Sequence, residues 1–189
     1  SIPAAPIEEI DQAKANKVRA AYLYSFLRFV SWPKTTATGG TRSEFRIAII
    51  GNPKLASIIQ RIAERKKFID RNSGVEIPIV VSSTGQLPGN ADLEMLYLAT
   101  ADDHSAFDQW VRRRPDGPVF VVRDEIGRLS SEAFTGTARF VVRGGGVKFD
   151  LNLDDARQRG LVMPAKLLSA ADRLRSQDAA DDTSSKSPE

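Results

Sequence analysis

Three short clusters in the sequence carry side chains that could do chemistry. Asp102-Asp103-His104 holds the only histidine and could form half of a metal shell. Asp124-Glu125 follows an apolar run, at the kind of sheet edge where α/β proteins collect ligands. Gly51-Asn52-Pro53 follows another apolar run, where a phosphate loop would lie. We favour the ordinary role of each cluster, because carboxylates cap helices and Asp, Asn, Gly and Pro build turns.

Neither glycine cluster has the pattern of a phosphate site. The Gly51 turn lacks both G-x-G-x-x-G and G-x-x-x-x-G-K-[ST], and Pro53 removes a backbone donor. Gly144-Gly145-Gly146 precedes an extended run rather than a helix, so it cannot place a phosphate on a helix N-terminus. Asp124-Glu125 does not form a phosphoacceptor site either, because that site needs further acids after the first strand.

The composition removes several reaction classes. The chain of 189 residues has no cysteine and one histidine. Thiol nucleophiles, Cys-ligated zinc, iron–sulfur clusters and disulfides are therefore excluded within this chain, as is a site with two histidines. The nucleophile motif G-x-S-x-G is absent as well. We predict a protein that is not an enzyme and that has no metal and no cofactor.

Charge gives no clear signature of nucleic-acid binding. The basic runs Arg65-Lys66-Lys67 and Arg112-Arg113-Arg114 fall at the expected ends of helices, where cations complement the helix dipole. Few aromatic residues stand beside them, so we predict no nucleic-acid partner. No apolar run is long enough to span a membrane, which predicts no direct membrane insertion. Residues 176–189 are polar and acidic, and we predict a disordered tail.

The pattern of apolar residues predicts alternating helices and strands. Helices are expected at 8–32, at 53–67 and at 102–114, and strands at 45–51, 75–82, 95–99 and 118–122. Pro78 places the strand at 75–82 at an edge of the sheet. One helical turn is expected at 129–134. This alternation predicts a mostly parallel sheet of five to six strands with helices on both faces.

The last third of the chain changes character. The runs 138–143 and 147–151 flank three glycines and predict a C-terminal hairpin. Asn152 is expected to cap a short helix that Gly160 ends. A last helix should start at Pro164 and bury Leu167, Leu168, Ala171 and Leu174. We predict an exposed segment at 1–16 and one domain at 17–175.

Aromatic residues concentrate in the first helix, with Tyr22, Phe26 and Phe29 at helical spacing and Trp32 just before Pro33. One interpretation is a buried core. The other is a subunit or partner interface, because aromatic residues are enriched in interface cores. The sequence leaves both open, since one face of a sheet cannot absorb all of these rings.

Two segments together resemble the YfiR family of small periplasmic proteins. The first is the aromatic-rich stretch 18–33, which closes with Trp32-Pro33. The second runs from Val147 to Leu161, with the Asn152 turn, an Ala-Arg helix and Gly-Leu, and Lys166-Leu167-Leu168 follows it. The strand at 45–51 lies between them in the expected order, and the resemblance spans about residues 17–172.

The resemblance implies a three-layer α/β/α fold, export to the periplasm and a homodimer. It also implies a regulatory role, namely restraint of an inner-membrane diguanylate cyclase through its periplasmic sensor domain, which would set cyclic-di-GMP output and biofilm formation. A chain that starts at Ser1 rather than Met fits a removed signal peptide or a trimmed sequence. Some family members carry cysteine pairs; their absence excludes redox control by a disulfide here.

Six residues are the candidate partner- or ligand-binding residues: Tyr22, Phe26, Phe29, Trp32, Asn152 and Arg157. Asn152 also fits a helix cap, and Arg157 a surface pair with Asp154. Met163-Pro164 stands where the family often has a hydroxyl residue, which puts a ligand role at that turn in doubt. The alternative function is a small-molecule domain for a nucleotide or amino acid, with Gly51, Asn52 and Asp124 at the strand ends.

Overall fold

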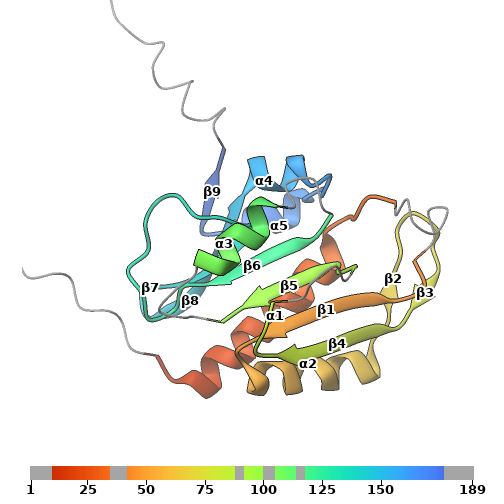
Figure 1. Ribbon diagram of the computed structural model, residues 1–189, viewed down its shortest axis with the longest axis horizontal. Coiled ribbons are helices and arrows are strands. Elements are labelled where there is room, and N and C mark those ends of the chain that lie inside the picture. Colours follow the sequence, from red (N-terminus) through yellow and green to blue (C-terminus); the bar gives the residue numbers. More distant parts are fainter. Residues whose placement is uncertain (1–9, 35–41, 88–91, 100–104, 114–117, 177–189) are drawn as a thin grey trace, which may run out of the picture.

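The computed structural model describes residues 10–34, 42–87, 92–99, 105–113 and 118–176. Its centre is a seven-stranded sheet in the order β4-β1-β5-β6-β7-β8-β9 (Figure 1). The strands are β1 (Phe45–Ile50), β4 (Ile79–Thr84), β5 (Met95–Leu98), β6 (Phe120–Asp124), β7 (Ala138–Arg143), β8 (Gly146–Asn152) and β9 (Arg173–Arg175). A separate pair joins β2 (Phe68–Ile69) to β3 (Glu76–Ile77).

The first five strands of the sheet are mutually parallel. Counted in chain order, these five run 2-1-3-4-5, the order of flavodoxin-like doubly wound sheets. β7 and β8 then form the antiparallel hairpin, and β9 returns parallel to β8. The mostly parallel sheet and the hairpin are confirmed, whereas the predicted strand number fell short because β9 was missed.

Helices cover both faces of the sheet. One apolar core joins that sheet to α1 (Gln12–Phe29), α2 (Pro53–Arg65), α4 (Leu153–Gln158) and α5 (Ala165–Ala170). A second, smaller core joins the other face to α3 (Ser105–Arg112) through Phe107, Trp110 and Val111. This arrangement is the three-layer α/β/α sandwich that the sequence predicted (Figure 1).

Local signals placed several elements correctly. Asn52 caps α2 by accepting a hydrogen bond from the Leu55 backbone N–H, at 3.0 Å, and Pro53 is the first helical residue. Asn152 caps α4 in the same way, accepting from the Asp155 N–H at 3.1 Å. Gly51 adopts φ +77°, and a Cβ there would lie 3.2 Å from the Cβ of Ala99. The chain can therefore turn from β1 into α2 only because residue 51 is glycine.

Other predictions need correction. The last helix ends at Ala170, and Leu174 belongs to β9, where it is 46% exposed. Pro78 divides the predicted strand into β3 and β4, although β4 does lie at the sheet edge. The turn at 129–134 contains no helix.

The predicted boundary at residue 16 falls inside α1, where Ala15 and Asn16 are already buried. The predicted metal half-site at 102–104 lies outside the described residues. So does the predicted disordered tail beyond Ser176.

Candidate functional site

A buried polar cluster links the first helix to the C-terminal ends of the parallel strands. The Nε atom of Arg19 on α1 lies 2.7 Å from Oδ2 of Asp124, the last residue of β6. The hydroxyl of Tyr97 on β5 donates to the same carboxylate oxygen, and the Ile126 N–H donates to Oδ1 at 2.9 Å. Arg19, Tyr97 and Asp124 are at most 4% exposed. The carboxylate is thus paired and hydrogen-bonded on both oxygens.

The same cluster extends to the switch point between β1 and β5, where flavodoxin-like sheets bind their ligands. The Nδ2 atom of Asn52, which follows β1, donates to Oδ1 of Asn16 on α1 at 3.0 Å. Arg19 donates to that oxygen as well, at 2.9 Å. The protein's own first helix therefore supplies partners to the side chains that would otherwise face a ligand there.

Burial and the charge of Asp124 raise the pKa of Tyr97 well above its ordinary value. The phenol therefore stays protonated at neutral pH and acts as a hydrogen-bond donor. Because the buried Tyr97 hydroxyl already donates to Asp124, which is itself paired with Arg19, we assign this phenol a structural role. This cluster answers the sequence-based hypothesis about Asn52 and Asp124: both residues have partners inside the protein.

A second charged cluster lies on the sheet face that carries α3, near the other end of the sheet. Asp150 of β8 is 0% exposed and binds Arg143 of β7 through two contacts, of 2.6 and 2.8 Å. The Nε of Arg139 reaches the same carboxylate at 2.8 Å. Arg139 also donates to the backbone oxygen of Ser131 and stacks over the ring of Phe134, at 4.7 Å. The arginine thereby holds the segment 125–137 against the sheet.

The carboxylate at the centre of this cluster is stabilised in its charged form. Burial alone would raise the pKa of Asp150, but the guanidinium groups of Arg143 and Arg139 outweigh burial and lower it. The same contacts raise the pKa of Arg143, which also reaches Asp172 at 2.6 Å. Three charged side chains from two strands thus behave as one unit.

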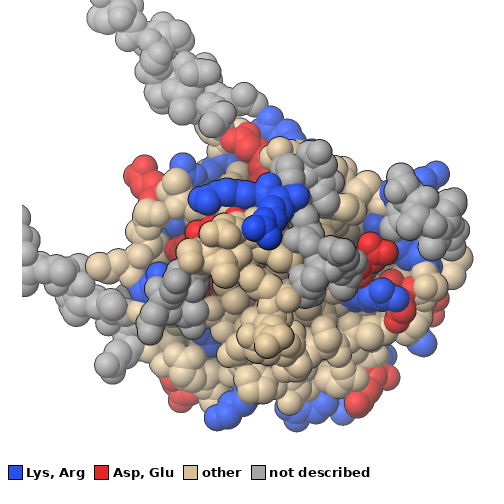
Figure 2. All heavy atoms as spheres, viewed as in Figure 1, with Lys and Arg blue, Asp and Glu red and all other residues tan. Residues whose placement is uncertain are grey.

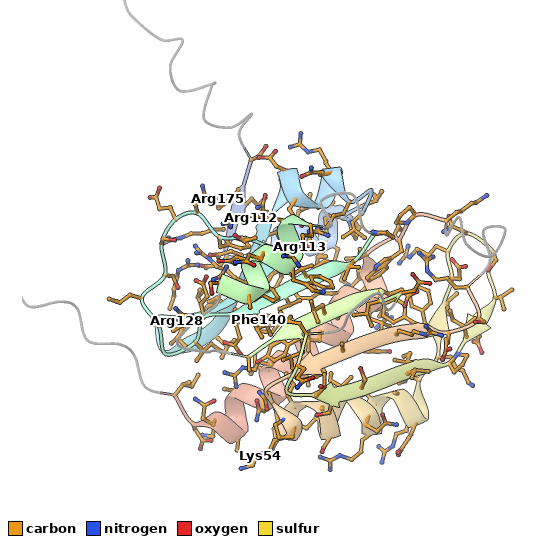
Figure 3. The ribbon with its side chains drawn as sticks, in the orientation of Figure 1. Lys54, Arg112, Arg113, Arg128, Phe140 and Arg175 are labelled. Atoms are coloured by element: carbon orange, nitrogen blue, oxygen red, sulfur yellow. The ribbon has the colours of Figure 1, made fainter. Side chains whose placement is uncertain are left out.

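A groove of about 700 Å³ opens beside this cluster, between the segment 132–136, α4 and β9. Its lining includes Phe134, Asn152, Arg173 and Arg175. Figure 3 labels Arg175 on β9 and Arg128 on the segment between β6 and β7. The volume is in the range that holds a small organic ligand.

The structure separates the six candidate residues. Phe26 is fully buried and stacks on Phe120 at 4.8 Å between ring centroids. Trp32 is 4% exposed, meets Phe45 edge-on at 4.9 Å, and donates its indole N–H to the backbone oxygen of Glu94. Both rings therefore belong to the core and not to the accessible surface.

Tyr22 and Phe29 are half-buried. Tyr22 donates its hydroxyl to the Val147 carbonyl oxygen at 2.8 Å, and the Lys166 ammonium lies 4.7 Å from the centre of the Phe29 ring. Asn152 caps α4 and also lines the groove, whereas exposed Arg157 lies 3.5 Å from Asp154 on the same helix. The helix cap and the surface pair that the sequence predicted are both present.

Sequence reasoning missed the buried ion pairs. Arg19 and Asp124 are far apart in the chain. The residues near Arg19 are typical of a solvent-exposed helix, and those near Asp124 are typical of a polar turn. For Arg139 and Asp150 a signal did exist. The structure places these two residues opposite one another, one position away from the register that a three-glycine loop implies, and opposite charges on the two runs could have indicated this cross-strand pair.

The fold and these clusters define a class of protein: a three-layer α/β/α domain whose switch point is filled by its own first helix. Residues 16–172 match the family model described as YfiR/HmsC-like. The chain therefore belongs to the YfiR/HmsC-like family. No curated protein sequence matches the chain. Among the described helices, none is long and apolar enough to cross a membrane.

Proposed function

We propose that this protein is a non-catalytic regulator in the periplasm that restrains an inner-membrane diguanylate cyclase by contact with the sensor domain of that cyclase. The observation that carries the proposal is the family match over most of the chain. The geometry agrees with a binding role, because the buried carboxylates Asp124 and Asp150 are engaged by arginines of the same chain. A homodimer is part of the same proposal.

Cells can test this function directly. Removing the gene should raise cyclic-di-GMP and biofilm formation, and restoring it with an export signal should reverse both. A strain whose cyclase carries an inactivated catalytic domain is the matched control and should not respond. Unchanged cyclic-di-GMP after removal, or an equal response in the control strain, would overturn the proposal.

Localisation and partner have their own measurement. An epitope-tagged chain should fractionate with the periplasm, and its cross-linked complexes should contain an inner-membrane protein with a cyclase domain. Recovery in the cytoplasm, or of soluble enzymes alone, would contradict the proposal.

The groove beside β9 favours a second function, the binding of a small molecule with a carboxylate or phosphate group. Arg173 and Arg175 of one short strand line the groove, and arginine is well suited to both anions. The lining also includes the acids Glu132, Asp154 and Asp155, of which Asp154 and Asp155 are paired with Arg157 and Arg159. A thermal-shift screen of carboxylates and phosphate esters should raise the melting temperature of the wild type but not of R173Q/R175Q. No shift by any compound at millimolar concentration would exclude this function.

A further inference from the structure

The outer edge of β4 offers backbone hydrogen-bonding groups with which no described strand pairs. β4 pairs only with β1 among the described residues, and it forms one border of the sheet. On its inner side, Pro78 accepts from the Phe45 N–H at 2.9 Å and Thr84 accepts from the Gly51 N–H at 3.1 Å. Parallel strands bond at alternate residues, so the backbone groups of Ile79, Val81 and Ser83 point outward.

This edge lacks the features that keep sheet edges from pairing. Natural proteins protect such edges with charge, proline or a bulge. The six residues Ile79–Thr84 contain no charged residue and no proline, and their register against β1 is continuous. Val80 is 41% exposed, and Ser82 and Ser83 are exposed. By contrast, β9 at the opposite border carries Arg173 and Arg175.

The helix beside β4 is basic on its exposed side. α2 packs beneath β4, and Ile59, Ile62 and Ala63 of the helix line one small cavity together with Ile79. Its outer side and the residues just after it expose five cations against one acid, Glu64: Lys54, Arg61, Arg65, Lys66 and Lys67. Figure 1 shows α2 alongside β4 at the lower border of the sheet, and Figure 2 shows Lys and Arg side chains along that rim, with some Asp and Glu beside them. Lys54 is labelled there in Figure 3.

We propose that β4 accepts an extended acidic segment of a partner protein as an additional strand of the sheet. Backbone bonds to Ile79, Val81 and Ser83 would hold the segment, and its side chains on the α2 face would meet the basic rim. A second copy of this chain fits the edge less well, because pairing two β4 strands would bring two basic α2 helices together. The identity of the partner rests on the proposed function, whereas the chemistry of the β4 edge does not.

A peptide pair tests the edge on the purified full chain. One peptide of nine residues alternates Glu and Val, and the other alternates Lys and Val. The acidic peptide should slow amide hydrogen exchange of Ile79, Val81 and Ser83 by tenfold or more, and this protection should weaken as salt rises. The lysine peptide should give no protection.

Substitution of one residue separates the edge from the fold. V81P removes an outward N–H while the bonds to β1, made by residues 80 and 82, remain. It should abolish protection by the acidic peptide, and V80T, which keeps the backbone and a β-branched side chain, should not. S83E changes no backbone group, but its added carboxylate should weaken binding of the acidic peptide. This second variant keeps the test valid if V81P fails to fold.

Four results would overturn the proposal. They are no protection by the acidic peptide, equal protection by the lysine peptide, unaltered binding by both V81P and S83E, and protection of these amides without peptide that rises with protein concentration. The last result would assign the edge to a second copy. In cells, a V81P chain that still restrains the cyclase would show that the β4 edge is not part of the contact with the cyclase. The proposed function would still stand. If the cyclase does not respond to the wild-type chain, the proposed function is wrong, but the peptide result still supports strand addition at β4.

Discussion

The two ends of the seven-stranded sheet are stabilised in different ways. At one end, β1 and β4 bury apolar side chains such as Ile47 and Ile79, and β4 itself is uncharged. The buried pair nearest to this end, Arg42 and Glu94, comes from the residues before β1 and β5. At the other end, β7 and β8 bury Arg139 and Asp150 as a cross-strand ion pair, and β9 adds arginines at the border. The charged end gains a fixed geometry and a protected edge. The neutral end keeps an edge that another chain can use.

The strongest test of this difference removes the central carboxylate of the charged end. D150A leaves the guanidinium groups of Arg139 and Arg143 without their buried partner, so we expect a loss of about 3–5 kcal/mol in the free energy of unfolding. S83A at the exposed edge of the neutral end is the control and should stay within about 0.5 kcal/mol. Urea unfolding measures both variants. Equal losses would show that the two ends do not differ.

The pH dependence of stability distinguishes two buried carboxylates. The lowered pKa of Asp150 means that its contribution is present above its ordinary value, near 4, and is lost as the pH falls through the lowered value. Glu94 accepts from the Arg46 N–H at 2.6 Å, yet burial raises its pKa. Its contribution is therefore present below its ordinary pKa and is lost as the pH rises through the raised value.

Unfolding measured from pH 2 to 7 should separate the two effects. In D150N, the free energy of unfolding should fall much less at acidic pH than it does in the wild type. In E94Q, it should fall somewhat less as the pH rises toward neutral. The same pH profile in both variants would contradict the opposite signs.

A smaller effect is expected at the neutral end. I79V removes one buried methylene from the contact between β4 and α2, and we expect a cost of about 0.5–1.5 kcal/mol. Because the loss is apolar, added salt should leave the difference from the wild type unchanged. Thermal unfolding at low and high sodium chloride measures this. A strong salt dependence would mean that the basic rim of α2 also contributes.

The smallest effect belongs to a surface pair near the charged end. Arg157 and Asp154 are both well exposed, with 58% and 42% of their side chains accessible. Exposed pairs contribute little, so R157A should cost less than about 0.5 kcal/mol. A larger loss in chemical unfolding would show that the charged end extends to α4.

Local patterns predicted much of this fold. The caps at Asn52 and Asn152, the hairpin and the alternation of strands and helices depend on neighbours in sequence. β9 was missed because Arg-Leu-Arg continues the apolar spacing of the helix before it, and only pairing with β8 makes it a strand.

The candidate site was less predictable for the same reason. The aromatic residues of α1 could face a core or a partner, and the sheet decides that Phe26 and Trp32 face the core. The unpaired edge of β4 depends on which strands flank it, which a single sequence does not state. Pro78 still indicated that this strand lies at a border.

The attachment of α1 to distant strands has a consequence for the order of folding. Tyr22 bonds to Val147, 125 residues later in the chain, and Arg19 has its partner Asp124 at the end of β6. Both partners are made long after the helix itself, whereas α2, on which the helix also packs, follows it closely in the chain. Contacts of such long sequence separation slow folding. Until β6 and β8 have been made, the helix can bury its apolar side only against nearer elements such as β1 and α2, and this is the period when a holding chaperone would matter most.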